Sequence, residues 1–185
     1  WFDWNWADSE AYFKQAIELN PNDTESHLGY AHLLSITGRH MQALAEVRRA
    51  RELSPFYPVA AALEGQFLLW ARQPDEALKS LQEAREQNEK FWLIRSSLAL
   101  VLMALDRYEE ALEEAKRARH LSGGSTWATA LEVGILAQLG RRIEAEELLG
   151  KILQRAENRY VPPWDIAVAY NGLDSPDDVL DWLDR

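Results

Sequence analysis

Cysteine is absent from this chain of 185 residues, which excludes disulfide bonds and thiol chemistry. No apolar run reaches the 18 or so residues that span a membrane, so we expect no membrane insertion of this segment. The chain also lacks a phosphate-binding glycine loop and a Gly-x-Ser-x-Gly nucleophile motif. We therefore predict no catalytic residue, no cofactor and no enzymatic activity.

Basic residues are scarce relative to acidic ones. The 20 lysines and arginines face 30 aspartates and glutamates, for a net charge of −10. Nucleic-acid binding needs a basic surface that neutralises phosphates, so this class of partner is excluded. The basic run at residues 48–51 shares its predicted helix with Glu46 and Glu52, which is typical of a solvated face.

Histidine is also rare, and its spacing does not indicate a metal site. His27 and His32 are five residues apart, which splays them on a helix, whereas a four-residue spacing would stack them. Aspartates gather between Asp174 and Asp184, but a calcium loop would need a glycine and a distant glutamate. We predict no metal ligand in the chain.

Small residues, in contrast, recur at a constant interval of 34 residues. One column consists of Ala43, Ala77, Ala111 and Ala145, and a second of Ala31, Gly65, Ala99, Val133 and Ala167. Leucine follows the same period at Leu34, Leu68, Leu102 and Leu136. Several columns in one register indicate an internal repeat of fixed length.

Each repeat reads as two antiparallel helices. In residues 24–57, apolar residues at helical spacing form a stripe on a first helix that ends at Gly38, a residue suited to a left-handed turn. A second stripe follows and stops at Pro55, because proline cannot continue the hydrogen-bond ladder. Ala31 and Ala43 let the two backbones approach closely, and a larger side chain at Ala43 or Ala77 would cost about 1–3 kcal/mol.

The same pattern predicts eleven helices along the chain. They are expected at residues 6–19, 24–37, 40–53, 58–71, 74–87, 92–105, 108–121, 126–139, 142–157, 162–172 and 176–184.

This pattern resembles the tetratricopeptide repeat, which has 34 residues and small side chains at fixed positions. The resemblance implies an all-α, right-handed superhelical solenoid of antiparallel helix pairs. We predict a single domain over residues 1–185 with a half repeat at 1–23, full repeats at 24–57, 58–91, 92–125 and 126–159, and a truncated repeat at 160–185. Glu64 and Glu132 stand where the family usually has a large apolar residue, which predicts looser packing around them.

In the resembling family, the first helix of each repeat lines a concave groove. The thirty groove positions of this chain include no lysine or arginine, so we exclude the family's mode of holding a C-terminal carboxylate. Apolar residues dominate the middle of the groove, as at an interface. The predicted peptide-binding residues are Leu63, Gln66, Trp70, Leu100, Met103, Trp127, Leu131, Trp164 and Val168.

These residues predict that the groove binds an apolar peptide or helix of a partner protein. Two alternatives stay open at this stage. The groove could be covered by another part of the same protein or by a second copy in a homo-oligomer, or the residues could simply form the core. The alternative function is a self-association or packing scaffold with no ligand of its own.

The ends of the chain carry a second resemblance. Trp1, Phe2, Trp4 and Trp6 crowd the start, which predicts a preceding helix in a longer array. The segments 3–22 and 159–167 resemble repeat arrays of bacterial proteins that follow winged-helix, kinase or cyclase domains. This resemblance implies a segment of a larger bacterial signalling or regulatory protein, in a cellular compartment that the sequence does not identify.

Overall fold

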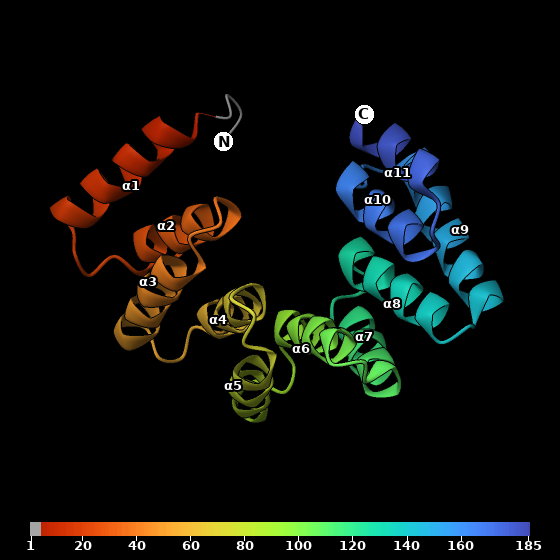
Figure 1. Cartoon of the computed structure of the whole chain (residues 1–185), viewed down its shortest axis with the longest axis horizontal. Helices are drawn as coiled ribbons and strands as arrows, with labels where there is room; N and C mark the ends of the chain where they lie inside the picture. Colours follow the sequence, from red (N-terminus) through yellow and green to blue (C-terminus); the bar gives the residue numbers. More distant parts are fainter. Residues whose placement is uncertain (1–4) are drawn as a thin grey trace. The chain divides into compact units, whose positions relative to one another are not determined.

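The computed structural model describes residues 5–185 and shows eleven α-helices and no strand in that range (Figure 1). Three of the tryptophan-rich first residues, Trp1, Phe2 and Trp4, lie outside it, and so does the prediction made from them. The helices are α1 (Trp6–Leu19), α2 (Thr24–Ile36), α3 (His40–Leu53), α4 (Pro58–Trp70), α5 (Pro74–Gln87), α6 (Trp92–Ala104), α7 (Tyr108–Leu121), α8 (Thr126–Gln138), α9 (Arg142–Asn158), α10 (Pro163–Gly172) and α11 (Pro176–Leu183).

The predicted all-α repeat architecture is confirmed, and each helix boundary lies within one residue of its expected place. The turns inside the repeats explain this accuracy. After each first helix, one residue adopts a left-handed conformation: Gly38, Arg72, Asp106, Gly140 and Asp174. The next amide then donates to the carbonyl five residues back, as Arg39 does to Leu34 at 2.8 Å. This Schellman geometry satisfies carbonyls that the helix end would leave without a partner.

The described part of the chain divides into two compact units, one that ends at residue 88 and one over residues 89–185. In the described part of the first unit, α2 packs against α3, α3 against α4, and α4 against α5. Ala31 and Ala43 are fully buried, as their predicted role at a close helix crossing requires. Gly65 also allows a close approach of two helices, because a Cβ there would lie 2.3 Å from the side chain of Leu81.

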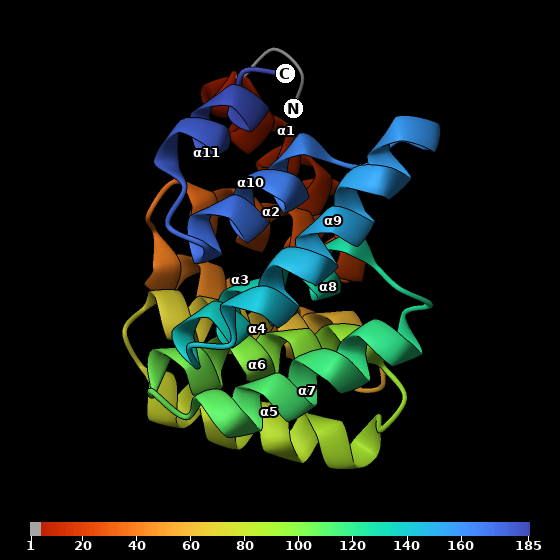
Figure 2. The same ribbon diagram turned by 90° about the vertical axis from the view of Figure 1, so that its right-hand side faces the viewer.

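In the second unit, the pairs are α6 with α7, α8 with α9, and α10 with α11. The first helices of successive repeats also touch, and α10 packs extensively on α8 (Figure 1), while α9 passes in front of α8 in the view of Figure 2. At this crossing the backbones of Gly134 and Gly172 are in contact. The continuous single domain over residues 1–185 stays a prediction. Within residues 5–185, none of the helices meets the length and hydrophobicity that a membrane span requires.

Glu64 and Glu132 are buried, at 5 and 3 % exposed, and each is held by arginine. Arg48 Nε lies 2.9 Å from Glu64 Oε1, and Arg51 contacts the other oxygen of the same carboxylate. Arg119 Nε lies 2.6 Å from Glu132 Oε2. Both carboxylates are thus buried and paired with an arginine of the preceding helix, and the looser packing expected around them stays a prediction.

Candidate functional site

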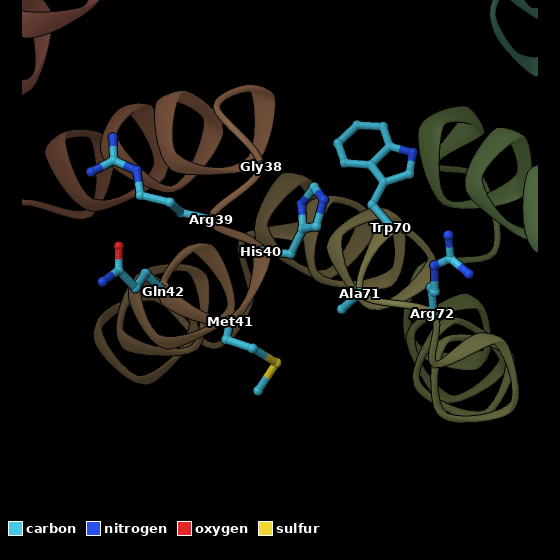
Figure 3. A pocket seen from close by; sticks show the side chains of 8 residues that line it. All are labelled: Gly38, Arg39, His40, Met41, Gln42, Trp70, Ala71 and Arg72. Carbon is cyan, nitrogen blue, oxygen red and sulfur yellow. The ribbon is translucent and has the colours of Figure 1, made fainter.

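A hollow of about 570 Å³ opens in the first unit, between the turn before α3 and the end of α4 (Figure 3). Its walls come from two neighbouring repeats, because one wall is the first turn of α3 and the other is the end of α4 with the residues that follow. The lining residues are Gly38, Arg39, His40, Met41, Gln42, Trp70, Ala71 and Arg72.

Trp70 is the large apolar residue of this hollow. It ends α4, and 41 % of it is exposed. Its ring lies 5.8 Å from that of Phe67, which is fully buried and in turn lies 6.4 Å from the ring of His32 on α2. Burial lowers the pKa of His32, which favours the neutral form of its ring. The indole is thus supported by the core on one side and open on the other.

The rim of the hollow is polar and partly cationic. Arg39 is held away from the opening by Glu10 of α1, with nitrogen–oxygen distances of 2.8 and 3.0 Å. Arg72, left-handed at a φ of 62°, also lines the hollow, and the rings of His40 and Trp70 lie on the same side of the view (Figure 3). The hollow therefore offers one aromatic surface between long polar side chains, and this arrangement suits an apolar side chain of a ligand.

The Glu10–Arg39 pair predicts a pH dependence of stability. Hydrogen bonds donated by Arg39 and Lys14 lower the pKa of Glu10 to about 2 from 4.5. A carboxyl whose pKa is lowered by folding stabilises the fold at pH values above its pKa in the unfolded chain. This contribution is lost as the pH falls from about 4.5 towards 2. Because both groups are partly exposed, we expect Glu10→Gln to cost about 1 kcal/mol at pH 7.

Urea unfolding of Glu10→Gln and of the unchanged chain at pH 7 and pH 3 measures this difference. It should shrink at the lower pH. An equal difference at both pH values would show that Glu10 acts through packing and not through its charge.

The structure places the nine predicted residues on the first helices of the repeats, but in both units. Leu63 and Gln66 lie with Trp70 on α4, and all three are at least partly exposed. On the second unit, Trp164 is 59 % exposed, and four others are partly exposed: Leu100, Met103, Trp127 and Val168. Leu131 is only 3 % exposed, because α8 lies between neighbouring helices, so it belongs to the core and not to a binding surface.

Only Trp70 of these nine is among the residues that line the hollow. Sequence reasoning missed the remaining lining residues because it searched first-helix faces and not turns. Met41 carried a usable signal: it lies outside the buried stripe of α3 formed by Ala43, Leu44 and Val47, and it is 63 % exposed. An exposed methionine next to a turn indicates a surface that contacts something else.

Comparisons with known proteins agree with the repeat architecture. Two profiles of the tetratricopeptide repeat match residues 5–45 and 63–126, together more than half of the chain. No curated protein sequence matches it.

Several solved structures share the fold. A thermophilic TPR protein of Thermus thermophilus is 20 % identical, with a TM-score of 0.77 over 89 % of this chain and 88 % of its own. MamA of Desulfovibrio magneticus is 18 % identical, with a TM-score of 0.64 over 85 and 90 %. YrrB, described as a TPR protein with an unusual peptide-binding site, is 24 % identical, with a TM-score of 0.56 over 93 and 89 %.

Proposed function

The chain belongs to the tetratricopeptide repeat family, and from this premise we propose that it binds an apolar peptide or helix of a partner protein. The family's fold is a protein–protein interaction scaffold, and its members are typically not enzymes. The single observation that carries the proposal is the half-exposed Trp70 at the wall of the hollow. The peptide-binding site in the description of YrrB supports the class of ligand.

Trp70 is the expected anchor because a large aromatic surface is already held in place before the ligand arrives. Its contact with buried Phe67 reduces the rotational freedom that binding would otherwise remove. Interface energy concentrates in a few such residues, and tryptophan is common among them. Leu63 and Gln66 extend the proposed surface along α4. The predicted residues of the second unit, without Leu131, form a separate part of the proposal.

Trp70→Ala tests the anchor. A library of random twelve-residue peptides is selected on the unchanged chain, and the dissociation constant of each recovered peptide is then measured by fluorescence anisotropy. We expect micromolar binding, which corresponds to about −8 kcal/mol. Loss of a tryptophan anchor costs about 2 kcal/mol, so Trp70→Ala should weaken binding about 30-fold.

Phe56→Ala is the matched control, because Phe56 is 93 % exposed and lies outside the lining of the hollow. It should leave affinity unchanged. Peptides that bind Trp70→Ala as tightly as the unchanged chain would refute the hollow as the site. Leu100→Glu examines the second unit in the same assay, and a loss of affinity there would support the proposed surface on α6.

Self-association is the second candidate function, and α11 favours it. None of the residues of this helix is buried, and Leu180 and Leu183 are 62 and 48 % exposed. A second copy would cover these side chains. Sedimentation velocity across a concentration series separates the two functions, since a monomer at high concentration contradicts self-association. The setting in a larger bacterial signalling or regulatory protein stays a proposal drawn from the two end segments.

A further inference from the structure

A second, smaller cleft lies in the second unit, among the end of α7, the start of α8 and the side of α9 that carries Leu148 and Ile152. Its volume is about 140 Å³, which is room for about four or five water molecules. Its floor is apolar and its rim is cationic. The lining residues are Arg119, Gly124, Thr126, Thr129, Leu148, Lys151, Ile152 and Arg155.

Two positive charges at this cleft have no acidic partner. Lys151 and Arg155 lie one turn apart on α9, and neither forms an ion pair within residues 5–185. Arg155 donates to the carbonyl of Gly124 at 2.8 Å, which fixes its guanidinium at the rim and leaves further N–H groups for a ligand.

Arg119 is the one other charged residue among those that line the cleft. Arg119 is neutralised by the buried Glu132. Asp165 of α10 does not line the cleft; it accepts a hydrogen bond from the hydroxyl of Thr126 at 2.5 Å, and burial raises its pKa. The hydroxyl of Thr129 is engaged with the carbonyl of Ser125. Binding donors at the cleft are therefore the two free cations and the backbone.

The backbone donors at the cleft are the first N–H groups of α8. Ser125 provides no side-chain cap, and no side chain of residues 5–185 accepts a hydrogen bond from the first amides of this 13-residue helix. A helix start carries partial positive charge and binds anions well, particularly beside cationic side chains.

The equivalent region two repeats earlier can be compared with this cleft. The buried ion pair is present there too, as Arg51 with Glu64, and it borders another hollow. At the places that correspond to Lys151 and Arg155, however, the earlier repeat has Glu83 and Gln87. The buried pair is thus a common structural element, whereas the two free cations are specific to the later cleft.

We propose that this cleft binds a phosphate group through Lys151, Arg155 and the first amides of α8. Two unneutralised cations match the charge of a phosphate dianion, and the small volume suits one such group. The site does not depend on the peptide-binding proposal, since it shares no residue with the hollow at Trp70.

Inorganic phosphate is the probe in the first experiment. The ¹⁵N-labelled chain is titrated at pH 7.5 and constant ionic strength while amide chemical shifts are recorded. We expect saturable shifts at Gly124, Thr126 and Trp127, with a dissociation constant of about 1 mM. The double variant Lys151→Gln with Arg155→Gln should bind at least tenfold more weakly, with an unchanged melting temperature.

The control variant also removes two positive charges, one at the start of α9 and one directly after its end, both away from the cleft. Arg142→Gln with Arg159→Gln should bind phosphate like the unchanged chain. Linear shifts without saturation, or equal affinity in the Lys151 and Arg155 variant, would overturn the proposal. Acetate serves as the second probe: saturation as tight as that of phosphate would reassign the cleft to carboxylates and also overturn it.

Discussion

Arg119→Ala should lower the free energy of unfolding by about 3 kcal/mol, because it leaves a buried carboxylate without its counter-charge. Glu132 is 3 % exposed, and the Nε of Arg119 lies 2.6 Å from its Oε2. Urea denaturation measures the loss, and hydrogen exchange of the amides of α7 and α8 locates it in the second unit.

Two further variants separate charge from packing. Adding Glu132→Leu to Arg119→Ala should restore most of the stability, since leucine already occupies the corresponding place at Leu98, where it is 1 % exposed. Arg51→Ala should cost less, because Glu64 keeps Arg48 at 2.9 Å. Equal losses in Arg119→Ala and Arg51→Ala would show that Glu132 finds another partner or water.

Gly172→Ala should destabilise the second unit by about 3 kcal/mol. A Cβ at this position would lie 2.5 Å from the Cα of Gly134, and backbone atoms cannot turn aside as a side-chain end can. The helices α8 and α10 would have to separate, which opens the packing on both sides of the crossing. Urea denaturation of the variant gives the size of the effect.

Gly134→Ala is the matched control at the same crossing. Its Cβ would lie 3.8 Å from the Cα of Gly172, an ordinary contact, and alanine favours a helix by up to about 1 kcal/mol over glycine. We therefore expect unchanged or slightly raised stability. Gly150→Ala, in open space on α9, should gain about 1 kcal/mol for the same reason. Loss of stability in Gly134→Ala would mean that the crossing tolerates no methyl group on either side.

The candidate site was predicted less completely than the helices. Periodicity singles out Trp70, because it lies on a first-helix face, and the structure finds it at the hollow. The same reasoning placed Leu131 on a surface, yet it is buried. A position within the repeat gives the direction of a side chain from its own helix, but whether a neighbouring helix covers it depends on how closely the two helices approach.

The amino-acid sequence by itself determined the repeat, its 34-residue period and each helix to within a residue, because these follow from local spacing and turn chemistry. Only the tertiary structure decided which polar groups meet. Arg119 and Glu132 are 13 residues apart on different helices, and Lys151 and Arg155 reach the start of α8 from a third. Such meetings depend on helix crossings, where small residues such as Gly172 set the approach of the backbones.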